Sequence, residues 1–159
     1  MSVRDLLTIE DEKHAEQLRT KVEHEVTDAS NETIQGVIQD MLDTSEAQGG
    51  LGLAAPQIGH PIRAFVLESR KGGEPLVVIN PRVVAKTGKA TSHNEGCLSV
   101  PGQRYNLKRA KSVVVTAIGQ DGKPLRIKTK NKMDAFIIQH EIDHLNGVLV
   151  CDKGVKENE

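Results

Sequence analysis

Two histidines lie four positions apart near the end of the chain, in the run His140-Glu141-Ile142-Asp143-His144. Residues at i and i+4 of a helix stand on the same face, so both imidazoles can bind one metal ion. The glutamate beside the first histidine can reach a water molecule at that metal. Structural histidines with an ion-paired glutamate are the alternative. Polar side chains within an apolar helix are costly unless they are satisfied, which favours the metal site.

A catalytic metal site has three protein ligands and an open position for water, so a third ligand must come from elsewhere. Cys97 is the candidate, because it lies in a glycine-flanked turn, Asn94-Glu95-Gly96-Cys97-Leu98-Ser99-Val100-Pro101. A lone cysteine is more often a small buried hydrophobe, and this is our interpretation of Cys151. The residue types alone leave both roles of Cys97 open.

A third feature is the small-residue run Gly49-Gly50-Leu51-Gly52-Leu53-Ala54-Ala55-Pro56-Gln57. Its glycine spacing and its proline exclude a dinucleotide-binding fingerprint. Glycines and alanines favour a backbone that a ligand approaches closely, with Gln57 as a neutral hydrogen-bond donor. A tight connection between a helix and a strand is the structural alternative.

The histidine pair requires a helix, which the sequence predicts over residues 132–146. Asn131 can cap its start, and Gly147 suits the left-handed conformation after its end. Apolar side chains cover most of its circumference, which predicts burial against a sheet. A second helix is expected to begin at Ser30 as N-cap and to end at Gly49-Gly50. Its apolar stripe consists of Ile34, Val37, Ile38, Met41 and Leu42.

Short apolar and β-branched runs predict strands at 63–67, 76–80, 83–85, 112–118 and 125–129. The pair Asp121-Gly122 favours a hairpin between the last two. The predicted fold class is α+β, with mostly antiparallel strands packed around a buried C-terminal helix. We expect a single catalytic domain over residues 1–159, with a variable acidic N-terminal segment (1–30) and a short polar tail (148–159).

The composition of the 159 residues limits the class of protein. With 21 basic and 22 acidic side chains and 37% hydrophobic residues, the chain is typical of a globular domain. No apolar stretch approaches the ~20 residues of a membrane helix, and no leader-like segment opens the chain. Two distant cysteines form no disulfide framework. We therefore expect a cytoplasmic monomer with no membrane partner. The few aromatic residues argue against a nucleic-acid stacking platform and sequence-specific nucleic-acid binding.

The region 104–132 is basic, with nine lysines and arginines against one aspartate. Such a ribbon could meet RNA or a ribosome surface. The alternative is the solvated face of a strand, on which Arg126, Lys128 and Lys130 alternate with apolar residues.

Three motifs together resemble those of the peptide deformylase family in order and separation: Gly50-Leu51-Gly52-Leu53-Ala54-Ala55-Pro56-Gln57, Glu95-Gly96-Cys97-Leu98-Ser99 and Gln139-His140-Glu141-Ile142-Asp143-His144-Leu145. The resemblance implies that Cys97, His140 and His144 hold one divalent metal ion, typically Fe²⁺, with Zn²⁺, Ni²⁺ or Co²⁺ able to replace it. It implies hydrolysis of the formyl group from N-formylmethionyl peptides, in a bacterium or a phage-infected host cell.

The resemblance also implies roles for individual residues. Glu141 would transfer protons, while the Gln57 amide and the backbone N–H of Leu98 would meet the developing oxyanion. Glu95 and Arg104 resemble a family ion pair that supports the turn of Cys97. Further substrate-binding positions are expected at Gly50, Leu51, Gly52, Glu95, Gly96, Met133, Phe136 and Ile137. The last three share the helical face of His140 and would form an apolar pocket for methionine.

Two other functions remain open from the residues. A zinc endopeptidase could use the same histidine pair, with a third ligand downstream such as Glu157. A metal-binding or ribosome-associated module without catalysis would need a fourth protein ligand, for which His93 is the nearest candidate. The chain also ends 12 residues after Gly147, whereas many family members continue into a C-terminal helix implicated in ribosome docking.

Overall fold

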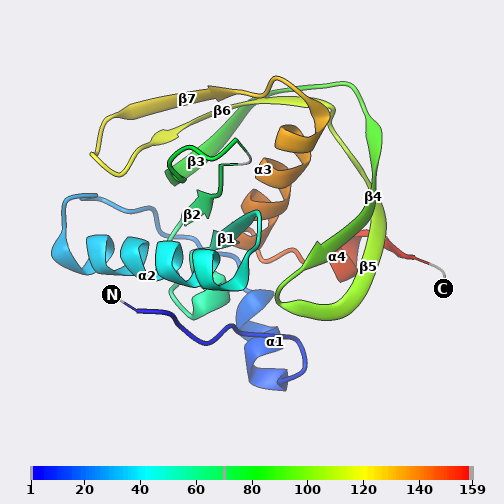
Figure 1. Ribbon diagram of the computed structural model, residues 1–159, viewed down its shortest axis with the longest axis horizontal. Helices are drawn as coiled ribbons and strands as arrows, with labels where there is room; N and C mark the ends of the chain where they lie inside the picture. Colours follow the sequence, from blue (N-terminus) through cyan, green and yellow to red (C-terminus); the bar gives the residue numbers. More distant parts are fainter. Residues whose placement is uncertain (1, 70, 158–159) are drawn as a thin grey trace.

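Two antiparallel sheets and two long helices form the framework of the computed structural model, which describes residues 2–69 and 71–157 (Figure 1). The larger sheet has the order β1-β2-β3-β6-β7, with strands Gly52–Ala54, Ala64–Leu67, Leu76–Thr87, Ser112–Ile118 and Pro124–Lys128. The smaller sheet has the order β4-β5-β8, with strands Ala90–Cys97, Val100–Arg109 and Val155–Lys156. All strand pairs are antiparallel, and α3 (Lys132–Leu145) packs among them. The predicted fold class is therefore confirmed.

Helix α3 begins and ends as its sequence predicts. The Asn131 side chain accepts a hydrogen bond from the backbone N–H of Asp134 and caps the first turn. Gly147 follows the helix with φ of 72°. A Cβ at Gly147 would lie 2.6 Å from the Arg19 carbonyl oxygen, so glycine is required there for space as well as conformation. One side of α3 enters an apolar cluster with the sheet: Ala135, Ile138, Ile142 and Leu145 pack near Phe65, Val78 and Val115.

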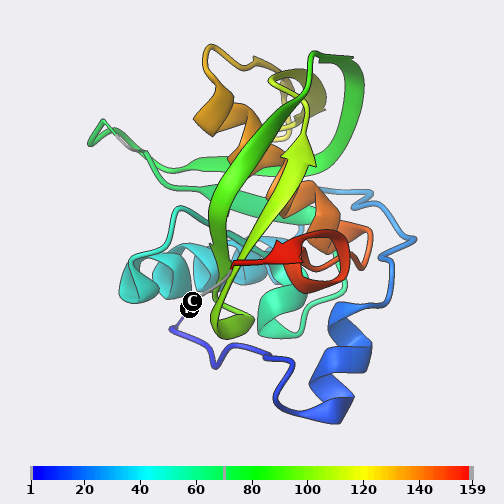
Figure 2. The same ribbon diagram turned by 90° about the vertical axis from the view of Figure 1, so that its right-hand side faces the viewer.

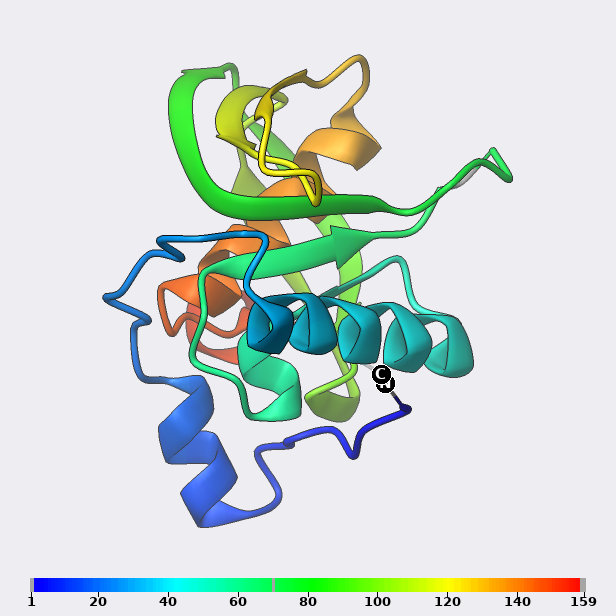
Figure 3. The same ribbon diagram turned by 90° about the vertical axis from the view of Figure 1, so that its left-hand side faces the viewer.

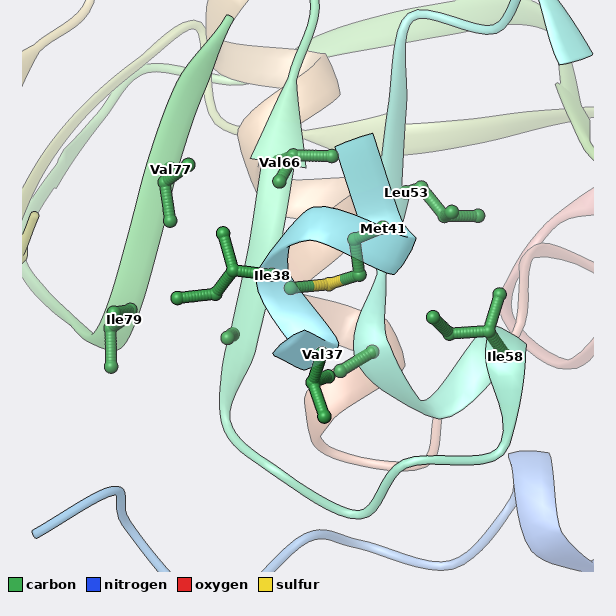
Figure 4. Packing of buried hydrophobic residues seen from close by; sticks show 10 residues of the cluster. Val37, Ile38, Met41, Leu53, Ile58, Val66, Val77 and Ile79 are labelled. Carbon is green, nitrogen blue, oxygen red and sulfur yellow. The ribbon is translucent and has the colours of Figure 1, made fainter. Parts of the chain in front are cut away.

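Helix α2 (Glu32–Gln48) lies against the opposite side of the sheet. Its side chains Val37, Ile38 and Met41 pack against β1, β2 and the first half of β3, as Figure 4 shows. Its N-cap is Asn31 rather than the expected Ser30. The Asn31 side-chain oxygen Oδ1 accepts from the backbone N–H groups at positions 33 and 34, whereas the Ser30 hydroxyl donates to Asp28.

Strand β3 is continuous where the sequence predicted two separate strands, 76–80 and 83–85. Irregular register between Ile79 and Arg82 accommodates Pro81, which lacks the N–H of a regular ladder. Asn80 adopts a positive φ of 53° at this point. Its side chain both accepts from and donates to the backbone of Val26, at 2.8 Å each. The bulge thus fastens the N-terminal segment to the sheet.

The hairpin of β4 and β5 was not predicted from the sequence. Residues 90–97 are mostly polar and lack an alternating pattern, so no periodicity marks them as a strand. The hairpin crosses one end of α3 and carries Cys97 at the last position of β4 (Figure 2). The turn of Cys97 expected from the glycine-flanked sequence is therefore the tip of this hairpin, formed by Leu98 and Ser99.

The two ends of the chain pack together beside this hairpin. Leu7 and Leu18, the latter at the end of α1 (Glu12–Leu18), form an apolar cluster with Leu149. The segment from 148 differs from the polar tail that we expected. It buries Leu149 and Val150 and forms α4 (Val150–Lys153) and β8.

The basic region 104–132 is divided between surface and interior. On β7, Arg126 and Lys128 are exposed and alternate with the half-buried Leu125 and Ile127, as a solvated strand face requires. Arg109 is instead buried. Within residues 2–69 and 71–157, no helix has both the length and the apolar character needed to cross a membrane.

Candidate metal centre

Cys97, His140 and His144 converge although the cysteine is more than 40 positions from either histidine. One potential ligand atom from each lies within 4.8 Å of the others. The Cys97 Sγ is 3.3 Å from His144 Nε2, and the two imidazole ring centroids are 5.0 Å apart. One sulfur and two nitrogens are ligands that Zn²⁺ and related transition metals accept. The side chains therefore fit a metal ion with three protein ligands.

The second nitrogens of the two imidazoles have different surroundings. His140 Nδ1 lies 2.7 Å from Glu95 Oε1, which leaves Nε2 as the nitrogen available to a metal. His144 uses its Nε2 toward the cysteine, while its buried Nδ1 has no hydrogen-bond partner among the described residues. A carboxylate thus fixes the orientation of the first ring only.

These surroundings move the histidine pKa values in opposite directions. Burial opposes protonation of His140, but hydrogen bonds to Cys97 and Glu95 outweigh burial and raise its pKa well above the usual value. Burial lowers the pKa of His144, and the neighbouring charge of His140 lowers it further. Two histidines on one helix face are therefore electrostatically distinct.

Glu141 is buried beside the histidines, with 4% of the residue exposed. Its Oε1 has no hydrogen-bond partner in the part of the chain that the structure describes, and burial raises the pKa of its carboxyl group to about 7. The other oxygen lies against β1, because a Cβ built on Gly52 would be 2.9 Å from Glu141 Oε2. Glycine at position 52 therefore makes room for the carboxylate.

Gln57 reaches the centre from the short 3₁₀ helix η1 (Ala55–Ile58) that follows β1. Its Oε1 accepts from the backbone N–H of Ala54 at 2.9 Å. Its Nε2 donates to Ser99 Oγ at 3.1 Å and lies 3.8 Å from Cys97 Sγ. The fixed carbonyl turns the amide N–H groups toward the cysteine, as an oxyanion donor requires.

The expected ion pair of Glu95 with Arg104 is wrong. Arg109, whose side chain is 1% exposed, pairs with Glu95 through Nε and Nη2, and its Nη1 is 2.9 Å from Asp143 Oδ2. Burial favours loss of both charges, but hydrogen bonds with His140 and Arg109 lower the pKa of Glu95 to about 2, and contacts with Glu95 and Asp143 raise the pKa of Arg109. Arg104 lies over Gly96 at the mouth of the site, where a Cβ would collide with its guanidinium.

A cavity of about 790 Å³ opens onto the centre. Every site residue expected from the sequence lines this cavity except His144, which lies behind it. Sequence reasoning missed Leu6, which also lines it, and the supporting residues Ser99 and Arg109. Ser99 lies within a motif that was recognised, whereas nothing in the sequence pattern separates Arg109 from the other basic residues around it.

The ligands required by the two other functions are not found at the centre. Among the described residues, the group close enough to hold a metal contains neither His93 nor Glu157. His93 is exposed at the cavity mouth. The backbone N–H of Glu157 instead donates to the Arg104 carbonyl beside β5.

Comparisons with known proteins agree with this geometry. A family model described as polypeptide deformylase matches residues 3–159. Peptide deformylase 2 of Vibrio vulnificus is 44% identical over 154 residues, covering 96% of this chain and 86% of that protein. The crystal structure of a peptide deformylase from Legionella pneumophila superposes with a TM-score of 0.87 at 39% identity, covering 97% of this chain and 87% of that one.

A peptide deformylase from Synechococcus elongatus, crystallised in complex with actinonin, has a TM-score of 0.83 at 33% identity. The match covers 98% of this chain and 80% of that one. Sequence and fold thus agree over almost the whole chain, and the three motifs meet at one cavity. This chain belongs to the polypeptide deformylase family.

Proposed function

We propose that this protein hydrolyses the formyl group from N-formylmethionine at the start of newly made polypeptides and releases formate. The observation that carries the proposal is the convergence of Cys97, His140 and His144 within 4.8 Å, beside a buried glutamate and an open cavity. Membership in the polypeptide deformylase family supports the same reaction.

The centre would hold one divalent metal ion through Cys97, His140 and His144. When bound, such an ion lowers the pKa of a coordinated water to about 7 and so supplies a nucleophile at neutral pH. Thiolate and imidazole ligands suit several metals, and the resemblance to the family favours Fe²⁺, with Zn²⁺, Ni²⁺ or Co²⁺ as substitutes. The carboxylate of Glu95 at His140 Nδ1 would hold that ring in the orientation for binding.

Glu141 is the proposed general base and acid. Burial raises the pKa of this carboxyl group to about 7 in the metal-free protein, and a carboxyl group placed beside the reacting water can take a proton and return it. Its unpartnered Oε1 is free to accept the proton of the attacking water, while Gly52 leaves room for the other oxygen. The same group would then protonate the leaving nitrogen of the peptide.

The negative charge that develops on the formyl oxygen would be met by Gln57 and the hairpin tip. The Gln57 amide nitrogen donates to Ser99 Oγ and lies 3.8 Å from Cys97 Sγ, and Leu98 follows the cysteine directly on the cavity wall. We assign the second donor to the backbone N–H of Leu98. Loss of one such donor typically lowers turnover by about 10²–10³-fold.

The cavity suits an apolar side chain with an extended backbone. Met133, Phe136 and Ile137 of α3 lie on one wall and would contact the methionine side chain. Gly50, Leu51 and Gly52 border the free edge of β1, where a peptide can add as a further strand. Glu95 and Gly96 lie on the wall formed by β4, and Arg104 lies at the mouth.

We further propose a cytoplasmic, monomeric enzyme that meets the nascent chain near the ribosome. The exposed Arg126 and Lys128 of β7 support an attraction to ribosomal RNA, which added salt would weaken steeply. Arg109 does not contribute to that surface, because it is buried and forms ion pairs with Glu95 and Asp143.

The decisive test offers the metal-loaded protein a formyl-Met tripeptide and, separately, an unformylated peptide. We expect formate release from the first and no internal cleavage of the second. Gln57→Ala should keep the metal and lower turnover about 10²–10³-fold, whereas Gln39→Ala, at a half-buried position of α2 that does not line the cavity, should leave turnover unchanged. Internal cleavage would identify a peptidase, and no reaction with either peptide would identify a non-catalytic module.

A further inference from the structure

The N-terminal segment passes directly beneath the candidate metal centre. In Figure 2 and Figure 3, the chain before α1 runs along η1 and the tip of the β4–β5 hairpin. The backbone N–H of Leu7 donates to the Gln57 carbonyl at 2.8 Å, and that of Ile9 donates to the Ser99 carbonyl at 3.0 Å. We call residues 6–9 the N-terminal strap.

The strap joins the two parts of the centre that approach each other from different elements. Gln57 comes from η1 after β1, whereas Cys97 and Ser99 come from the β4–β5 hairpin of the other sheet. Among the described residues, no backbone hydrogen bond links η1 directly to residues 97–99. Two alternate N–H groups of the strap make that link instead.

The contacts made by the Gln57 side chain depend on the same separation. Its Nε2 donates to Ser99 Oγ at 3.1 Å and lies 3.8 Å from Cys97 Sγ. A change in the distance between η1 and the hairpin would therefore alter both contacts. Leu6 also lines the cavity, so the strap forms part of the cavity wall.

The segment before the strap is held to α2. Asp40, which is 3% exposed, accepts from the Arg4 side chain at 2.9 Å and from the backbone N–H of Ser2 at 2.7 Å. The backbone N–H of Arg4 donates to Thr44 Oγ1 at 2.8 Å. At the other end of the strap, the Ile9 side chain packs with Val100 and Leu107. Both ends of the strap are thus fixed to the body of the protein.

We propose that the N-terminal strap is a positioning element that fixes the Gln57 side-chain amide relative to Cys97. It does so through the hydrogen bond from the backbone N–H of Leu7 to the backbone carbonyl of Gln57. The proposal rests on the proposed function of Gln57 as an oxyanion donor. Complete loss of that donor would lower turnover about 10²–10³-fold, so a displaced amide should lower it by about tenfold or more.

The test separates this hydrogen bond from apolar packing at one position. Leu7→Ala keeps the N–H and loses contacts with Leu18 and Leu149, whereas Leu7→Pro loses both. We expect both variants to lower the melting temperature. Only Leu7→Pro should lower kcat by about tenfold or more, with KM changed less than kcat. Equal kcat values for the two variants would overturn the proposal.

A second readout does not depend on turnover. The absorption spectrum of the Co²⁺-loaded protein reports the surroundings of the bound thiolate, and we expect Leu7→Pro, but not Leu7→Ala, to change it. In a Gln57→Ala background, Leu7→Pro should have no further effect on kcat, because both changes act through one amide. If the two substitutions lower kcat by factors that multiply, the strap acts through a group other than the Gln57 amide.

Should Leu7→Pro fail to fold, replacement of residue 7 by the α-hydroxy analogue of leucine removes only the N–H and keeps the side chain. The same loss of kcat is expected, and a normal kcat contradicts the proposal. Absence of formate release from the unchanged protein would refute the proposed function alone. The Co²⁺ spectra of the variants would still test whether the strap positions the groups around Cys97.

Discussion

Helices α2 and α3 cover opposite sides of the same sheet, yet only α3 carries chemistry. The buried side of α2 combines Val37, Ile38 and Met41, which pack in one apolar cluster, with the polar residues Asp40, Thr44 and Ser45. The buried side of α3 mixes apolar residues such as Ile138 with Glu141 and His144. Each buried polar group needs a partner, and two atoms of this pair have none within the described residues.

The contrast shows where a packing rule is broken for function. On α2, the buried Asp40 and Thr44 accept hydrogen bonds from the N-terminal segment, whereas the Ser45 hydroxyl has no partner within the described residues. On α3, the unpartnered Oε1 belongs to Glu141, which lines the cavity, and His144 presents its Nε2 to Cys97 while its unpartnered Nδ1 lies on the other side of the ring. A local departure from consistent packing is expected at functional sites, and on α3 it involves two ionisable residues of the candidate metal centre, Glu141 and His144.

The largest expected effect is that of Glu141→Gln, which removes the proposed proton carrier without changing its shape. Turnover should fall by about 10³-fold or more, within the range of general acid–base catalysis. The metal-free protein should lose no stability, because a buried, unpartnered carboxyl group is replaced by a neutral amide. Formate release and thermal unfolding would measure the two effects. Normal turnover would place the proton carrier elsewhere.

Paired truncations on the two helices would sharpen the comparison. Ile38→Ala and Ile138→Ala both remove a buried side chain, and each should lower the free energy of unfolding by about 2–5 kcal/mol. Only Ile138→Ala should also lower kcat, by about tenfold, because α3 holds the reacting groups. Denaturant unfolding and steady-state kinetics test this. An equal loss of kcat in Ile38→Ala would remove the proposed division between the helices.

Gly52→Ala should disturb the site with little change in the core. The new Cβ would lie 2.9 Å from Glu141 Oε2 and 3.0 Å from the Val66 carbonyl oxygen. A displacement of about 1 Å at a reacting group can lower turnover about 10²-fold, so we expect a loss of that size with the metal retained. Metal content and kcat measured on the same sample provide the check. Unchanged kcat would mean that the carboxylate tolerates the shift.

The smallest effect is expected from the matched change on α2. A Cβ at Gly36 would meet nothing within 4 Å, and this glycine lies inside the helix. Gly36→Ala should therefore raise the free energy of unfolding by about 0.5–1 kcal/mol and leave kcat unchanged. Urea unfolding would measure the gain. A loss of stability would show that α2 packs more tightly at this position than the contacts indicate.

Local signals in the sequence identified much of the fold and most of the cavity. Asn131 and Gly147 marked the ends of α3, and the Asp121-Gly122 pair marked the hairpin of β6 and β7. The cap of α2 was misplaced by one residue, since Ser30 and Asn31 are both good caps. The polar strand β4 carried no periodic pattern and was missed.

The sequence by itself determined that His140 and His144 share one face of a helix, because that relation depends only on helical periodicity. Only the tertiary structure decided which distant groups meet them. Cys97 arrives through the β4–β5 hairpin, Arg109 takes the carboxylate expected for Arg104, and the N-terminal strap reaches the Gln57 carbonyl. These contacts depend on sheet register, bulges and the packing of separate elements, which no local pattern specifies.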